Sequence, residues 1–172
     1  SFESLRRYND ILIRSYENII SAGGYLEMNR NFLDKKEYEK LSAYDSVILA
    51  TDAIHALSVE DRRFYFDPTY LTIEPIYYDG MSNILSVIGY NHIDQKYKKY
   101  LPSGLRLRSI NEKDITGSSI SGAENALKLI DKLDKQKLYT DLKMRGIKKI
   151  KFEDLEKVLK TINKRLFFIK NH

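Results

Sequence analysis

The chain has 172 residues, of which 42% are hydrophobic and 31% are charged, and its formal net charge is +5. This balance is typical of one soluble globular domain over residues 1–172, and the absence of cysteine excludes disulfides and thiolate metal sites. No apolar run approaches the roughly 18 residues of a membrane span, and no signal peptide is visible. We therefore expect no membrane span, and the sequence leaves open whether the chain is cytoplasmic or associated with the cell envelope.

Two helices are predicted in the first third of the chain. Apolar residues at helical spacing predict a helix over residues 2–22, which a pair of glycines ends. Asp34 and Glu37 have the form of a capping box, in which an acceptor at the cap is followed three residues later by Glu. The apolar stripe behind that box predicts a second helix over residues 35–56.

A β-hairpin is predicted next. Residues 62–66 and 73–78 are rich in side chains that fit a pleated surface, and residues 67–69 (DPT) are typical of a turn. Pro75 has no N–H to donate, so its strand should lie at an edge or leave that position unpaired. Residues 80–117 contain many Asn, Gly, Pro and Ser residues, and we expect loops with short helical turns there.

Three further helices are predicted in the last third. Ser121 and Glu124 have the form of a second capping box, opening a helix that continues towards Leu133. Another helix is predicted over residues 135–144, ending before the next glycine, and a last helix should begin near Phe152. Together these elements predict a mainly α fold with a small β-hairpin, of the α+β class.

Asp61 and Asp79 are the candidate metal ligands. Antiparallel strands place the start of one beside the end of the other, so the hairpin would bring both carboxylates to one end. Mg²⁺ prefers oxygen ligands, and one or two carboxylates with substrate phosphates suffice to hold it. Gly80 would let the backbone approach a ligand closely. The alternative is that Asp79 and Gly80 form only a turn after the strand, which is the commoner use of this dipeptide.

His55 and Asp52 are the candidate catalytic groups. His55 lies six residues before Asp61 and could orient a catalytic loop or act as a general acid or base. Asp52 is three residues earlier on the expected helix and could hydrogen-bond to it. The alternatives are a packed or capping histidine and a solvated aspartate. Of Arg62 and Arg63, strand alternation lets only one face a phosphate, and we expect the other to be a surface ion-pair partner.

Other chemistry is not indicated. His92 and His172 have no ligand spacing with other candidate ligands, so no zinc site is predicted. Basic residues of the C-terminal region are interleaved with acidic ones, which favours a solvated face over nucleic-acid binding. No phosphate-binding loop, nucleophile elbow or dinucleotide fingerprint is present. The thirteen tyrosines support an alternative function, a non-enzymatic helical interaction or assembly domain with a tyrosine-rich contact surface.

Three segments resemble the catalytic-core signature of CotH-like atypical kinases. They are residues 55–57 (HAL), 61–68 (DRRFYFDP) and 74–80 (EPIYYDG), and the resemblance covers residues 52–85. It implies the C-terminal lobe of a protein-kinase-like fold and metal-dependent phosphoryl transfer from a nucleoside triphosphate to a protein. The implied cofactors are Mg²⁺ and ATP, and the implied partners are a protein substrate or a missing N-terminal lobe.

The resemblance also implies roles for individual residues. Asp79 would match the metal-binding Asp after the second strand, and Asp61 would match a metal-binding catalytic-loop position that is usually Asn. Asp52 is the nearest match to the catalytic Asp, with His55 beside it. Of the two arginines beside the proposed metal site, Arg63 is the one that we expect to contact the nucleotide. The sequence departs from the family at Asp61, and no Gly-rich strand-loop-strand precedes the first helices. The chain would then be a C-terminal lobe or a pseudokinase, inactive by itself.

Overall fold

The computed structural model describes residues 3, 5–6, 33–58, 60–89 and 107–172. Its elements are α2 (Lys35–Ala50), the short 3-10 turn η1 (Ile54–Leu57), β1 (Arg63–Asp67), β2 (Thr72–Ile76), the 3-10 turns η2 (Ile84–Ile88) and η4 (Glu112–Asp114), α3 (Gly117–Asp131), α4 (Lys135–Met144) and α5 (Phe152–Lys170). The mainly α fold with a small hairpin is therefore confirmed. The helix predicted over residues 2–22 lies almost wholly outside the described residues.

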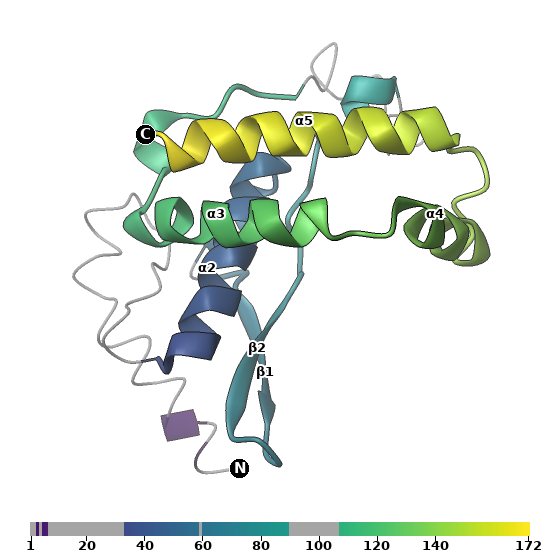
Figure 1. Cartoon of the computed structure of the whole chain (residues 1–172). Helices are drawn as coiled ribbons and strands as arrows, with labels where there is room; N and C mark the ends of the chain where they lie inside the picture. Colours follow the sequence, from purple (N-terminus) through teal and green to yellow (C-terminus); the bar gives the residue numbers. More distant parts are fainter. Residues whose placement is uncertain (1–2, 4, 7–32, 59, 90–106) are drawn as a thin grey trace.

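The helices form one packed group from which the hairpin extends. In Figure 1, α3 and α5 lie side by side, α2 crosses them, and α4 lies at the N-terminal end of α5. Apolar side chains of α2, α3, α5 and the turns η1 and η2 form the main core. None of the helices in the described part of the chain has the length and apolar character of a membrane span.

Glu37 joins the start of α2 to the hairpin. The predicted capping box is present: the Glu37 N–H donates to Asp34 Oδ1 (2.8 Å), and the Asp34 N–H donates to Glu37 Oε2 (3.3 Å). Glu37 Oε1 accepts a further hydrogen bond from the backbone N–H of Ile73 in β2 (3.0 Å). A buried carboxylate needs such partners, so this one residue both starts α2 and fixes where β2 lies against it.

The end of α2 differs from the prediction that it continues to Ala56. The helix ends in a Schellman motif: the N–H of Ala53 donates to the Ile48 carbonyl (2.9 Å) and the N–H of Asp52 to the Leu49 carbonyl (3.1 Å). Asp52 takes the left-handed position of this motif, with φ of 56°. The sequence does not reveal that the helix ends here, because glycine usually occupies the left-handed position of this motif.

The start of α3 also differs from the prediction. The helix begins at Gly117, and its capping box pairs Thr116 with Ser119 rather than Ser121 with Glu124. The Ser119 N–H donates to Thr116 Oγ1 (3.2 Å), and the Thr116 N–H donates to Ser119 Oγ (2.9 Å). The first turn contains only small residues, so apolar periodicity could not reveal it. The helices α4 and α5 begin where the sequence predicted.

Small residues let α2 and α3 approach closely. A Cβ built on Gly122 of α3 would lie 2.0 Å from the backbone carbonyl carbon and oxygen of Ser42 in α2. Beside this contact, Ser46 Oγ donates to the Ser119 carbonyl (2.5 Å) and to the Ser42 carbonyl (2.9 Å). The two backbones therefore meet without room for a side chain between them.

We predict that Gly122→Ala destabilises the fold, because the added methyl group must push two backbones apart. Overpacking of this kind costs about 1–3 kcal/mol, to be measured by urea unfolding followed by circular dichroism. Ser121→Ala is the matched control, since Ser121 is exposed one position earlier on the same helix. Equal unfolding midpoints for Gly122→Ala and the wild type would contradict the close contact.

Candidate functional site at the open end of the hairpin

The hairpin brings Asp61 and Asp79 to its open end. Strands β1 and β2 pair antiparallel, from Arg63 opposite Ile76 to Asp67 opposite Thr72. The predicted hairpin is thus confirmed, with each strand boundary shifted by one or two residues. Asp61 precedes β1 and Asp79 follows β2, so both lie at the end opposite the turn. In this two-stranded sheet each strand is an edge, as Pro75 required.

Asp61 is held by a local turn. Its backbone N–H donates to Ser58 Oγ (3.1 Å), and the Ser58 hydroxyl donates to Asp61 Oδ2 (3.0 Å). The Arg62 N–H closes the turn by donating to the Ser58 carbonyl (2.9 Å). This arrangement orients the half-buried carboxylate, and Oδ1 takes no part in the bond to Ser58.

Asp79 lies in a tight and conformationally unusual segment. Asp79 has φ of 39° and Met81 has φ of 48°, and both are exposed. Left-handed backbone at residues other than glycine is costly and is often found at functional sites. A Cβ on Gly80 would lie 2.6 Å from the ring of Tyr77. The ring of Tyr77 therefore occupies the space that a side chain at position 80 would need.

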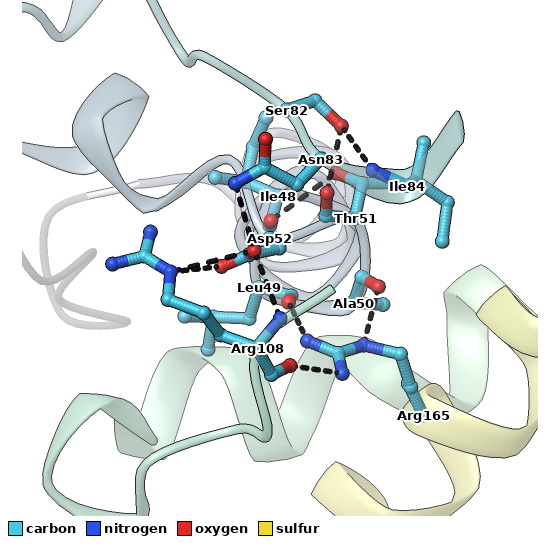
Figure 2. Close-up of polar contacts among 10 residues, drawn as sticks. All are labelled: Ile48, Leu49, Ala50, Thr51, Asp52, Ser82, Asn83, Ile84, Arg108 and Arg165. Carbon is cyan, nitrogen blue, oxygen red and sulfur yellow. Dashed lines mark hydrogen bonds and ion pairs between the residues drawn. The ribbon is translucent and has the colours of Figure 1, made fainter. Parts of the chain in front are cut away.

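The segment after Asp79 is tied to the end of α2. Ser82 Oγ donates to the Thr51 carbonyl (2.7 Å), and the Ser82 N–H donates to the Tyr77 hydroxyl (3.4 Å). Figure 2 shows Ser82, Asn83 and Ile84 lying against the last residues of α2. The open end of the hairpin and the C-terminal end of α2 therefore form one structural unit.

Asp52 is a buried acceptor within that unit. Its side chain is only 8% exposed, and its Oδ2 accepts hydrogen bonds from Asn83 Nδ2 (3.1 Å) and the Arg108 N–H (3.2 Å). Arg108 Nε donates to Oδ1 at 3.0 Å, and Figure 2 shows these contacts converging on the carboxylate. The expected placement of Asp52 inside a helix is wrong, because Asp52 occupies the motif that ends α2. His55, its expected partner, is exposed in η1.

Arg165 closes the same end of α2 from the distant helix α5. Its Nε donates to the Ala50 carbonyl (2.7 Å), Nη2 to the Leu49 carbonyl (3.3 Å) and Nη1 to the Arg108 carbonyl (2.7 Å). Burial lowers the pKa of the Arg165 guanidinium, and the charge of Asp52 opposes that shift. The sequence placed Arg165 only in a basic C-terminal region, since nothing local signals a cap that acts across the fold.

The two neighbouring arginines have different environments. The Arg62 side chain is 1% exposed, and its Nη2 lies 2.5 Å from Oδ1 of the equally buried Asp45. The expectation that the second arginine forms a surface ion pair is therefore wrong, because Arg62 points into the core. Arg63 is exposed, with its guanidinium 5.0 Å from the centre of the Tyr78 ring. Of the pair, Arg63 is the residue on the accessible face.

The described carboxylates permit at most a sparse metal site. In the part of the chain that the structure describes, no group of three or more His, Cys, Asp or Glu residues could hold a metal ion. Asp61 and Asp79 would form a site with two protein ligands. Such a site suits Mg²⁺, which retains several waters and takes further oxygens from phosphates.

The comparisons with known proteins found no relatives. No protein family, no curated protein and no solved structure matches this chain. The resemblance to CotH-like kinases therefore rests only on the three sequence segments that carry it.

We predict that Asp52→Ala lowers the free energy of unfolding by about 2–3 kcal/mol, because it leaves part-buried donors of Asn83 and Arg108 without their acceptor. Asp52→Asn should cost less, since asparagine tolerates left-handed backbone and keeps one acceptor oxygen. Urea unfolding of both variants checks this. Equal stability of Asp52→Ala and the wild type would show that the carboxylate does not hold the unit together.

We predict a loss of stability at alkaline pH that depends on Tyr44. Burial raises the pKa of Tyr44 from 10.0 to about 12, although Arg62 acts to lower it, and the hydroxyl donates to the Ile76 carbonyl (3.2 Å). The raised pKa contributes stability that is complete below pH 10 and is lost as pH rises through about 12. Urea unfolding at several alkaline pH values should show a smaller loss for Tyr44→Phe. An identical pH dependence in both proteins would refute this assignment.

Proposed function

We propose that this chain is the metal-binding lobe of a CotH-like atypical kinase, with Asp61 and Asp79 as ligands of Mg²⁺ and ATP as the nucleotide. The observation that carries the proposal is the antiparallel register, which leaves both carboxylates at one end of the hairpin. The three segments that carry the resemblance lie at the turn η1, at β1 with its flanking residues, and at β2 with the bend that follows it. The phosphate acceptor in the intact parent would be a protein.

The surrounding residues divide into accessible and structural groups. His55 and Arg63 are exposed, so both are accessible to a bound nucleotide or substrate. Asp52 is buried, and both of its oxygens accept hydrogen bonds. We therefore assign Asp52 a positioning role, in which it holds the segment after Asp79 in place, rather than a role as proton acceptor.

The proposed chemistry requires little from this chain beyond two correctly placed carboxylates. Mg²⁺ would neutralise the negative charge on the transferring phosphate, and phosphoryl transfer depends mainly on such positioning and electrostatic stabilisation. The contribution of the chain is to hold two carboxylates on a turn and a strained loop that are both braced against α2. We expect magnesium-dependent nucleotide binding from this lobe, and no turnover by it alone.

We predict that the chain binds ATP in a magnesium-dependent manner and that Asp79→Ala weakens this binding by about tenfold or more, because removal of one charged ligand costs at least ~1.4 kcal/mol. Isothermal titration with and without magnesium measures the effect. Asp131→Ala is the matched control, since Asp131 is an exposed carboxylate at the end of α3. Unchanged affinity of the Asp79→Ala variant for magnesium and ATP would contradict the metal assignment.

A second function, a non-enzymatic interaction domain, is favoured by the exposed side chains of the hairpin. Large apolar or aromatic residues at and beside the two strands are more than two-fifths exposed: Tyr65, Tyr70, Leu71, Ile76, Tyr77, Tyr78 and Met81. Tyrosine suits such contact surfaces because its ring combines apolar area with a polar tip. Absence of magnesium-dependent nucleotide binding in the wild type would favour this second function.

A further inference from the structure

The connection between α4 and α5 carries a dense group of cations. Residues 143–151 contain no Asp or Glu, and we call this segment the basic turn. Its cations are Lys143, Arg145, Lys148, Lys149 and Lys151. All of these except Lys143 are exposed, and the basic turn lies beside α4 at the right-hand edge of Figure 1, away from α2 and the hairpin.

Hydrogen bonds fix the shape of the basic turn. Helix α4 ends in a Schellman motif, with Gly146 at φ of 94°, the Ile147 N–H donating to the Leu142 carbonyl (3.0 Å) and the Gly146 N–H donating to the Lys143 carbonyl (3.1 Å). Lys143 Nζ donates to the Lys148 carbonyl across the turn. A surface that is already ordered loses little conformational entropy when it binds a partner.

The positions of the cations are not explained by helix stability alone. Lys143 and Arg145 lie at the C-terminal end of α4, where positive charge interacts favourably with the helix dipole. Lys149 and Lys151 instead lie at the N-terminal end of α5, where the dipole disfavours positive charge. The first turn of α5 itself carries two acidic residues, which suit that end of the helix and partly offset these lysines, so helix stability does not require the lysines there.

Two apolar side chains are exposed among these charges. Met144 is 73% exposed and Ile147 is 37% exposed. Ile147 occupies the position of the Schellman motif from which an apolar side chain usually packs on the last helical turn. The motif gives Met144 no such role. The basic turn therefore presents apolar side chains surrounded by cations, the combination found in proteins that bind to membrane surfaces.

We propose that the basic turn docks on a membrane surface containing anionic phospholipids, with its cations on the headgroups and Met144 and Ile147 at the boundary with the acyl chains. Charge complementarity and the exposed apolar pair favour this partner. Single-stranded nucleic acid would instead require exposed rings for base stacking. The neighbouring rings of Tyr139 and Phe152 are half-buried and pack edge to face, with centroids 5.6 Å apart.

The test is co-sedimentation of the full chain with vesicles of phosphatidylcholine alone and of phosphatidylcholine mixed with phosphatidylserine. We expect binding only to the anionic vesicles, weakened by added salt. Lys148→Gln/Lys149→Gln should reduce partitioning by about tenfold, since each cation near such a surface contributes several-fold. Met144→Gln should reduce it by about threefold through lost apolar contact.

The matched control is Lys160→Gln/Lys164→Gln, which removes the same charge from exposed positions of α5 outside the basic turn. Circular dichroism of each variant verifies that it is folded. Equal binding to neutral vesicles, or equal losses in the two double variants, would overturn the proposal. Binding to duplex DNA at a salt concentration where anionic vesicles are not bound would also overturn it and would identify nucleic acid as the partner.

Discussion

The buried ion pair between Asp45 and Arg62 is the interaction on which the arrangement of this protein depends. It joins the middle of α2 to the residue that directly precedes β1. Ser118 Oγ of α3 donates to the second oxygen of Asp45 (3.0 Å). Burying two charges is costly, and loss of one partner typically costs about 3–5 kcal/mol. The pair therefore requires the start of the hairpin and the start of α3 to meet at one point on α2.

The candidate site follows from this constraint and from the way α2 ends. The chain leaves α2 through the left-handed Asp52, and the segment after β2 returns to the same place through Ser82 and Asn83. Arg165 then covers the last carbonyls of α2 from the far end of the sequence. Two carboxylates, Asp61 and Asp79, therefore lie beside a unit that is tied to α2 on both sides of the hairpin.

The sequence predicted where the candidate residues lie relative to the hairpin better than it predicted their environments. The aromatic runs and the turn at Asp67 predicted that both carboxylates lie at the same end of the hairpin, because antiparallel pairing is set by local chemistry. The burial of Arg62 could not be predicted from the sequence, since its partner Asp45 lies on another element and neither residue carries a local sign of the pairing. Asp52 was assigned to a helix because Asp is a rarer choice than Gly for the position that ends one.

The sequence by itself determined the elements whose signals are local: the cap that starts α2, the hairpin and its turn, and the two C-terminal helices, because periodicity, capping and turn chemistry act between neighbouring residues. The tertiary structure alone decided how closely α2 and α3 approach, which arginine is buried, and what covers the last carbonyls of α2. Each of these depends on a partner distant in the chain: Ser42 against Gly122, Asp45 with Arg62, and α2 with Arg165. Such contacts form only when the packed backbone brings the residues together.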